Sequence, residues 1–343
     1  MFQLKNKLNK EECLKLLAQE DFKRITLSFY RYVKIKEPRV FRDELFAELA
    51  EIRVLGRIYV AGEGINAQIS VPEPHFERFK SILNSHEELK DMYLNIAVEN
   101  KESFYKLKIK IRKQIVTDGL PEDSYDLSQV GKHLTAEEFN AALDEGALVV
   151  DMRNFYESRI GRFEGALCPD SETFKEELPM AVEALKGQED KKVLLYCTGG
   201  IRCEKASAYF KHKGFKDVNQ LRGGIISYAH EVKQKGLESK FKGNNFVFDE
   251  RLNERITEDI LSDCDQCDTA CDAYTNCQNA ACNLLFIQCE ACQERMNNTC
   301  SDFCKDIAAL PDAEKKAYYA QQKSTDYSGY KSRIRPKLKA SRQ

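Results

Sequence analysis

The sequence lacks several features that would assign it to a common functional class. No run of 18 consecutive apolar residues occurs, which excludes a membrane-spanning helix. Neither sign of charge dominates, since 53 basic residues stand against 55 acidic ones, so any contact with nucleic acid must come from local basic patches. No apolar segment of signal-peptide length follows the lysines of residues 1–10, and we therefore expect a cytoplasmic protein.

Motifs for common redox cofactors are absent from the sequence as well. It contains no Gly-x-Gly-x-x-Gly fingerprint for a dinucleotide. The five histidines stand apart, and no His-x-Asp or His-x-Glu pair suggests an iron site with two histidines and one carboxylate. The residues therefore leave any redox cofactor unidentified.

With 343 residues, the chain is long enough for two or three domains. Apolar residues make up 42% of the sequence, which is enough for each domain to bury its own core. In the first, residues 1–118, the apolar spacing predicts strands and helices in the order β-α-β-β-α-β. This order is typical of a ferredoxin-like (acylphosphatase-like) α+β fold. We expect strands at 24–34, 54–61, 65–71 and 93–98, and helices at 38–52 and 74–84.

A basic segment closes this first domain. Lys106, Lys108, Lys110 and Arg112 alternate with aliphatic residues, which places four cations on one face of a strand. Lysines on an edge strand prevent aggregation, so the stripe is consistent with a solvated edge. It is also found on surfaces that contact phosphates, and the residues alone leave both interpretations open.

Residues 117–128 are polar and rich in turn formers, and they predict a linker to a second domain at 129–236. Short apolar strands alternate with helices there, which predicts an α/β fold with a mostly parallel sheet. Ligands of such sheets bind at the carboxyl ends of the strands. Cys197 lies at one such end.

The loop after this strand favours a reactive thiolate. Two glycines within residues 198–201 let successive amides point inward, and Arg202 opens the next helix. Amides and a helix N-terminus favour an anion, so the pKa of Cys197 should fall below about 8.5. We expect the sulfur to face these amides, where it is a nucleophile. The predicted anion loop comprises Thr198, Gly199, Gly200 and Ile201.

Residues 130–235 resemble a rhodanese domain. In that family a six-residue catalytic loop begins with cysteine and ends near an arginine, as Cys197 to Arg202 does. The related dual-specificity phosphatases have one more residue, so the shorter ring suits a sulfur, as thiolate or persulfide, better than a phosphate. The flanking segments that share the resemblance are Asp151-Met152-Arg153 with Glu157, Gly165-Ala166, and Leu221-Arg222-Gly223-Gly224.

Four further residues are candidates for this site, each with two interpretations. Arg202 is either a fixed cation beside the loop or an exposed arginine at the start of a helix. Cys203 is either a resolving thiol or a buried core cysteine. Asp151 and Arg153 either line the mouth of the site or form an ion pair that orders the loop.

The last region, 244–343, is rich in cysteine. Nine of the 13 cysteines lie between positions 264 and 304, among 14 acidic and four basic side chains in residues 249–312. Clustered thiols in the cytosol indicate structural zinc rather than disulfides, with free thiols or an iron–sulfur cluster as alternatives. Four pairs predict two zinc ions, with the first and third pairs sharing one and Cys271 left over. The predicted ligands are Cys264, Cys267, Cys277, Cys282, Cys289, Cys292, Cys300 and Cys304.

The order of the three regions resembles the rhodanese-containing tRNA uridine hydroxylases over nearly the whole chain. The segments 62–70 (GEGINAQIS) and 197–207 (CTGGIRCEKAS) carry this resemblance together with the cysteine-rich region. It implies oxygen-dependent conversion of the wobble uridine of tRNA to 5-hydroxyuridine, with Cys197 in the active site. It also implies that the basic strand and the basic tail at 331–343, which we expect to be disordered alone, contact tRNA.

Two other functions remain compatible with the residues. The anion loop alone is typical of a sulfurtransferase that carries a persulfide on Cys197. A non-enzymatic adaptor for RNA or protein is compatible with the cysteine-rich region and the basic segments. The oligomeric state, the tRNA species and the electron donor are not predicted.

Overall fold

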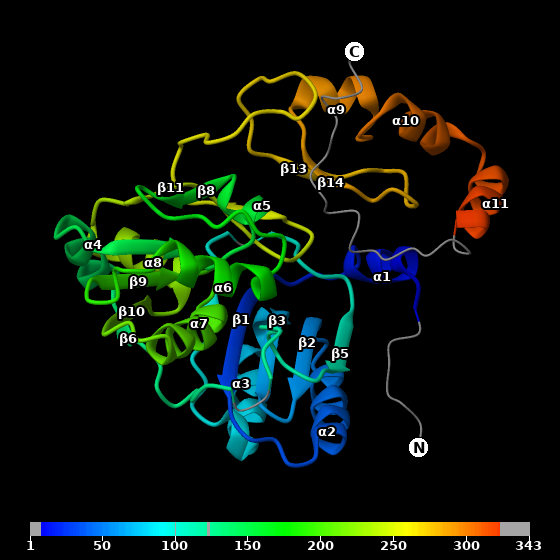
Figure 1. Ribbon diagram of the computed structural model, residues 1–343. Coiled ribbons are helices and arrows are strands. Elements are labelled where there is room, and N and C mark those ends of the chain that lie inside the picture. Colours follow the sequence, from blue (N-terminus) through cyan, green and yellow to red (C-terminus); the bar gives the residue numbers. More distant parts are fainter. Residues whose placement is uncertain (1–7, 100, 122–123, 323–343) are drawn as a thin grey trace.

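A computed structural model describes residues 8–99, 101–121 and 124–322. Three units follow one another along the chain, from blue to red in Figure 1. None of the helices in the described part of the chain has both the length and the apolar character needed to cross a membrane. The basic segment 331–343 lies outside the described residues.

The first unit has the predicted ferredoxin-like fold. Its sheet has the strand order β4-β1-β3-β2-β5, in which β5 runs parallel to β2 and the other pairs are antiparallel. Apolar residues on one face of the sheet pack against α2 and α3, around the fully buried Leu45, Ile58 and Phe79. The elements are α1 (Lys10–Leu17), β1 (Arg24–Tyr32), α2 (Pro38–Glu51), β2 (Leu55–Ala61), β3 (Gly64–Pro72), α3 (Phe76–Ser85), β4 (Asn95–Ile96) and β5 (Leu107–Ile111).

Two details of this unit differ from the prediction. Helix α1 was not expected, although Asn9 caps it and Glu12 returns a hydrogen bond to the Asn9 amide, a pattern visible in the sequence. Strand β4 pairs over only two residues, whereas we expected a strand over 93–98.

The second unit contains the predicted parallel sheet, in the order β6-β10-β9-β7. Helices α4 and α8 pack on one face around Phe139, and α6 and α7 pack on the other around Leu178 and Phe210. A capping box begins α4, because the Thr135 side chain accepts a hydrogen bond from the amide of Glu138 and the Glu138 carboxylate accepts one from the amide of Thr135. The elements are β6 (Lys132–Leu134), α4 (Ala136–Asp144), β7 (Leu148–Asp151), α5 (Phe155–Ser158), β8 (Gly161–Phe163), α6 (Phe174–Ala184), β9 (Lys192–Tyr196), α7 (Ile201–His212), β10 (Asp217–Leu221) and α8 (Gly224–Lys235).

The first strand of the third unit belongs to a sheet that is shared with the second unit. Strand β11 pairs with β8 on one side and with β12 on the other, so a small antiparallel sheet joins the two units. A hairpin of β13 and β14 and three helices follow, and the cysteines lie around them. The elements are β11 (Phe241–Phe246), β12 (Asn253–Arg255), β13 (Tyr274–Asn276), β14 (Leu285–Ile287), α9 (Glu290–Met296), α10 (Asp302–Ala309) and α11 (Asp312–Gln322).

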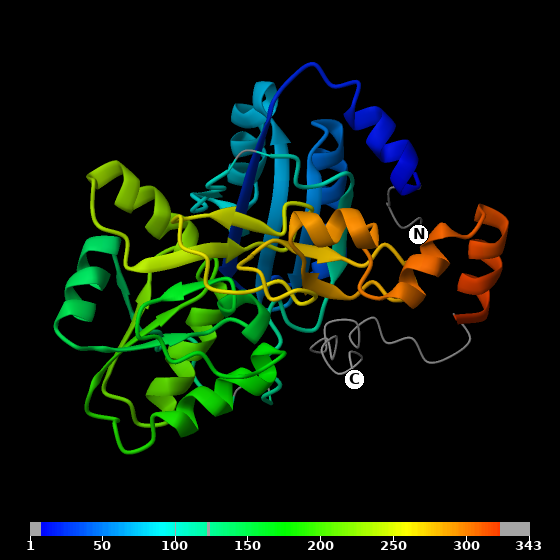
Figure 2. The ribbon, with the colours of Figure 1, turned by 90° about the horizontal axis from the view of Figure 1, so that it is seen from above.

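The first unit packs against both of the others (Figure 2). The segment predicted to be a linker packs against the rest of the protein at Asp118, which is 3% exposed. Its carboxylate accepts a hydrogen bond from Tyr125 at 2.7 Å and pairs with Lys205 at 3.2 Å. These contacts fasten the connection onto α7, so the polar face of the first sheet lies over the carboxyl end of the parallel sheet.

Candidate active site

Cys197 follows β9 directly and begins the loop that leads into α7. The loop closes at Gly200, whose φ of +99° is left-handed and favours glycine. A Cβ at Gly200 would also lie 2.8 Å from the hydroxyl of Tyr30. A tight turn and the close approach of the first unit therefore both require glycine at this position.

The sulfur of Cys197 is oriented toward the loop amides. The Gly200 amide donates a hydrogen bond to Sγ at 3.1 Å, and the side chain is fully buried. Burial raises the pKa of Cys197, but the thiol of Cys203, the charge of Arg202 and the amides of Arg202 and Gly200 together lower it to about 6. The thiolate therefore predominates at neutral pH.

Cys203 packs inward from the first turn of α7 and is also fully buried. Burial raises the pKa of its thiol, and the neighbouring Cys197 sulfur raises it further. A protonated Cys203 beside an ionised Cys197 acts as a hydrogen-bond donor to the thiolate.

Arg202 is not the exposed arginine that one interpretation expected. Its guanidinium donates to both carboxylate oxygens of Glu157, at 2.7 and 2.8 Å, and it is only 8% exposed. Burial lowers the pKa of Arg202, but the charge of Glu157 and its hydrogen bonds raise it well above the usual value. Arg202 is thus a fixed cation next to the loop. Glu157 was expected only as part of the resemblance, and its pairing with Arg202 was not predicted.

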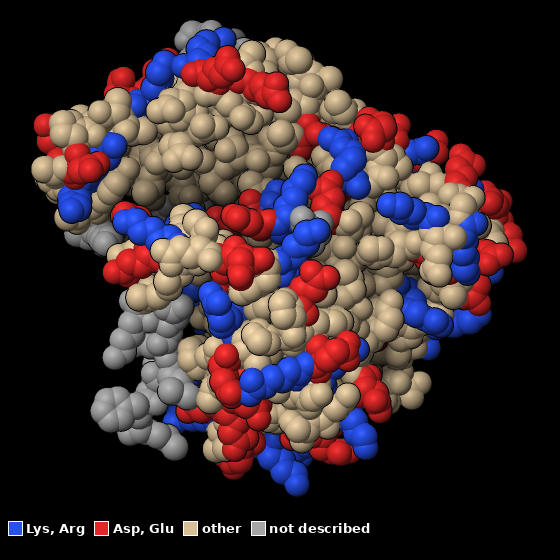
Figure 3. All heavy atoms as spheres, turned by 180° about the vertical axis from the view of Figure 1, so that it is seen from behind, with Lys and Arg blue, Asp and Glu red and all other residues tan. Residues whose placement is uncertain are grey.

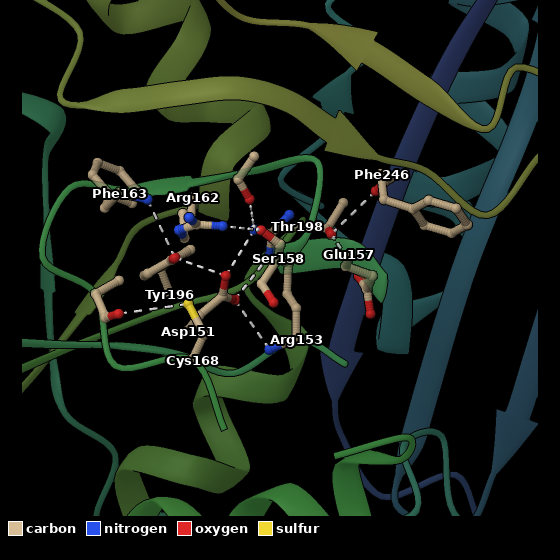
Figure 4. A network of polar contacts seen from close by, with 12 residues as sticks. Asp151, Arg153, Glu157, Ser158, Arg162, Phe163, Cys168, Tyr196, Thr198 and Phe246 are labelled. Atoms are coloured by element: carbon tan, nitrogen blue, oxygen red, sulfur yellow. Dashed lines mark hydrogen bonds and ion pairs between the residues drawn. The ribbon is translucent and has the colours of Figure 1, made fainter. Parts of the chain in front are cut away.

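Asp151 and Arg153 form an ion pair inside the protein and do not line the mouth of the site (Figure 4). Both side chains are fully buried, and Arg153 donates to the two carboxylate oxygens at 2.8 and 2.7 Å. The Tyr196 hydroxyl donates to the same carboxylate at 2.7 Å, and Arg153 also donates to the Gly161 carbonyl. This network joins β7 to β8 and to the end of β9. It therefore fixes the strand end from which the Cys197 loop starts.

The first unit contributes the other wall of the site. Tyr30 donates to Glu204 at 2.9 Å, Tyr32 donates to the Ile201 carbonyl at 3.3 Å, and Asn95 donates to the Gly223 carbonyl at 2.7 Å. These contacts hold the polar face of the sheet over the Cys197 loop.

A cavity of about 330 Å³ lies between the sheet and the loop. Cys197, Thr198, Gly199, Ile201 and Arg202 line it from the loop side. Side chains that were not predicted to belong to the site line the cavity from the sheet and from the segment after β11. They include Ser28, Tyr30, Arg57, Tyr59, Asn66, Gln68, Phe248 and Arg251. Polar residues alternate with apolar ones in 65–70, which signals a polar sheet face without showing what that face covers.

Of the four cations in the predicted basic stripe, Lys108 and Lys110 are on β5, an edge strand, whereas Lys106 and Arg112 directly flank it. Leu107 and Ile109 point into the core, whereas Lys108 and Lys110 are exposed on the other side. Ile111 departs from the expected alternation, because it is 43% exposed at the end of the strand. Figure 3, which shows the back of the molecule, has charges of both signs interspersed, as the near-zero net charge predicts.

Eight cysteines gather in two groups of four. Cys264 and Cys267 meet Cys289 and Cys292, as predicted for the first and third pairs, and all their sulfurs lie within 4.8 Å of one another. The second and fourth pairs form the other group within the same limit, which contains Cys277, Cys282, Cys300 and Cys304. Each group is able to hold one metal ion.

Comparison with known proteins covers all three units. Models of the UPF0176 acylphosphatase like domain, the Rhodanese-like domain and the Rhodanase C-terminal region match residues 24–115, 135–231 and 242–305. A tRNA uridine(34) hydroxylase of Leptospira interrogans is 53% identical over 98% of this chain and 92% of its own length. One of Pectobacterium carotovorum is 49% identical over 92% of this chain and 89% of its own. Among solved structures, a thiosulfate sulfurtransferase from Pseudomonas aeruginosa matches 33% of this chain and 20% of its own, at 24% identity and a TM-score of 0.27.

Proposed function

Because this chain belongs to the family of tRNA uridine(34) hydroxylases, we propose that it hydroxylates the wobble uridine of tRNA and that Cys197 is its active-site residue. The relationship over 98% of the chain carries this proposal. The proposed product is 5-hydroxyuridine, formed in the cytoplasm with molecular oxygen as co-substrate. One oxygen atom enters the C5–H bond and the other leaves as water, so the reaction needs two electrons from an external reductant.

The thiolate of Cys197 is the proposed nucleophile. A sulfur that adds to C6 of uracil places electron density on C5, the carbon that is oxidised. Burial raises the pKa of Cys197, but the Cys203 thiol, Arg202 and the loop amides lower it by more. The resulting low pKa keeps the sulfur ionised for this addition. Arg202, held by Glu157, and Cys203 are proposed as positioning residues that maintain the charge on sulfur.

Zinc is the proposed occupant of the two cysteine groups. A tetrahedral ion with Zn–S bonds of about 2.3 Å requires sulfurs about 3.8 Å apart. The distances between Cys267 and Cys289, Cys282 and Cys300, and Cys300 and Cys304 are 3.5, 3.6 and 3.7 Å. Arg295 also donates to Cys292 at 3.2 Å, which favours a ligated thiolate. Both sites would serve folding, because they lie among the buried residues of the third unit.

Mass spectrometry of tRNA nucleosides tests the function. A strain without this protein should lose 5-hydroxyuridine and its derivatives, and the wild-type gene should restore them while Cys197→Ser should not. Unchanged levels in a strain that has no parallel pathway would refute the proposal. Growth under ¹⁸O₂ should place the label in the product, and label from water instead would refute the role of oxygen.

Sulfur transfer is the second candidate, because the amide that faces Cys197 would also stabilise a persulfide. Thiosulfate as donor and cyanide as acceptor test it directly. Rapid thiocyanate formation without hydroxylated tRNA would favour this candidate over the first.

A further inference from the structure

The roof of the cavity over Cys197 carries two neighbouring amides on β3. Asn66 donates through Nδ2 to the Ile115 carbonyl at 3.4 Å, and a carbonyl only accepts. Oδ1 of Asn66 therefore points toward Gln68, whose Nε2 donates to it. This chain of hydrogen bonds sets the orientation of the Gln68 amide. Within the described residues, no protein group is bonded to its Oε1 or to the second N–H of its Nε2.

Gln68 thus offers one acceptor and one donor, side by side and fixed in order, at the wall of the cavity. Uracil presents a complementary pair, because N3–H donates and O4 accepts. Cytosine has an acceptor at N3 and donors at N4, so in the same position both contacts would be repulsive.

We propose that this cavity takes one unstacked pyrimidine nucleotide of single-stranded RNA, and that Gln68 selects uracil over cytosine. The assignment rests on the proposed function and extends it to the residues that recognise the base. The cavity, about 330 Å³, lies at the small end of the range for ligand sites and suits one nucleoside rather than a base pair. Enzymes that modify a base take it out of its stack, and loops of RNA allow this at low cost.

The phosphate of that nucleotide has its own subsite at the edge of the cavity. Arg57 lines the cavity from β2 and lies opposite Lys108 in the β2–β5 register, as Tyr59 does opposite Lys110. The backbone of Arg57 is paired in the sheet, but its guanidinium has no hydrogen bond or ion pair with another described residue. These cations repel one another in the free protein, since the pKa of Lys108 is lowered by burial and by Lys106, Arg57 and Lys110. A phosphate bound there would relieve this repulsion, and the Tyr59 ring provides a stacking surface.

Binding of two stem-loop RNAs, which differ only in having U or C at position 34, tests the selection. We expect the full-length protein to prefer the U34 RNA by about tenfold, and Gln68→Leu to reduce this preference to within about twofold. Arg57→Gln should weaken the binding of both RNAs by the same factor. Gln19→Leu and Arg39→Gln are matched controls, because both residues are exposed and neither lines the cavity. A preference that Gln68→Leu leaves unchanged, in a variant with the wild-type circular dichroism spectrum, would overturn the proposal.

Photo-crosslinking locates the base without relying on turnover. A stem-loop with 4-thiouridine at position 34 should crosslink to peptides that contain residues 55–72, which form β2 and β3. Crosslinks confined to residues 264–322, none of which lines the cavity, would overturn the cavity assignment even if tRNA is hydroxylated. Correct crosslinks and selection without any hydroxylation would support the cavity and refute the proposed function instead.

Discussion

Arg202 and Glu157 form a doubly hydrogen-bonded ion pair behind the loop that carries Cys197. The two N–O distances are 2.7 and 2.8 Å, and the side chains are 10% and 0% exposed. The pair joins the start of α7 to α5, and the Thr198 hydroxyl also donates to Glu157 at 3.3 Å. One carboxylate therefore holds both the cation and a loop residue of the candidate active site.

Removal of this carboxylate should destabilise the protein strongly. Glu157→Gln removes the carboxylate that is hydrogen-bonded to the buried Arg202 guanidinium, and the loss of one partner of a buried pair costs about 3 kcal/mol or more. We expect a matching decrease in the free energy of unfolding, measured with urea. Glu137→Gln is the matched control, because Glu137 pairs with Lys235 on the surface and should change stability by less than about 0.5 kcal/mol. Equal stability of the two variants would contradict the prediction.

The alkylation rate of Cys197 should follow a pKa of about 6. The thiolate is the reactive form, so the rate rises as the pH increases through this value and falls about tenfold per pH unit below it. Iodoacetamide labelling, followed on the Cys197 peptide by mass spectrometry, measures the profile apart from the other cysteines. A midpoint at or above about 8.5, the value of a free thiol, would contradict the thiolate assignment.

Cys203 should contribute to this low pKa. Burial opposes ionisation of Cys197, and the hydrogen bond from Cys203 is first among the interactions that favour it. Cys203→Ala should therefore move the midpoint of the alkylation profile to higher pH. Cys168→Ala should leave it in place, because the Cys168 thiol bonds to the Ala166 carbonyl instead. An unchanged midpoint in Cys203→Ala would exclude this role of Cys203.

Local signals predicted the elements around Cys197 correctly. The strand, the two glycines and the helix that follows are contiguous in sequence, and their conformation depends on hydrogen bonds between near neighbours. The Thr135 capping box and the Gly62–Gly64 connection between β2 and β3 also form between near neighbours in sequence. The order of strands and helices along the chain and the spacing of apolar residues were therefore sufficient to predict the ferredoxin-like unit and the parallel sheet.

The composition of the cavity was not predictable in this way. Gln68 and Cys197 come together only because one domain packs on another, and no periodicity encodes that contact. The sheet of β8, β11 and β12 was missed because β8 and β12 have three residues each, too few for a pattern. The pairing of Arg202 with Glu157 likewise depends on tertiary burial, whereas the ion pair of Asp151 with Arg153 was one of the two interpretations that the sequence offered.

Zinc content should report the two cysteine groups separately. We expect two zinc ions per chain in the purified protein, by metal analysis, and one in Cys292→Ser, because that change breaks a single group. Cys271→Ser is the matched control, since Cys271 belongs to neither group and accepts a hydrogen bond from the Ala273 amide. Chelation should unfold the third unit. Loss of zinc from Cys271→Ser, or no zinc in protein kept reduced, would contradict the assignment.

The basic face of β5 should control how strongly tRNA binding depends on salt. Lys108 and Lys110 are exposed beside the cavity, and each phosphate contact releases counter-ions. In Lys108→Gln/Lys110→Gln, the slope of log affinity against log salt should become shallower by about 1 to 2. Arg78→Gln/Lys80→Gln removes the same charge from α3, on the other face of the sheet, and should preserve the slope. Equal slopes in both double variants would identify β5 as a solvated edge strand, the alternative that its sequence also allows.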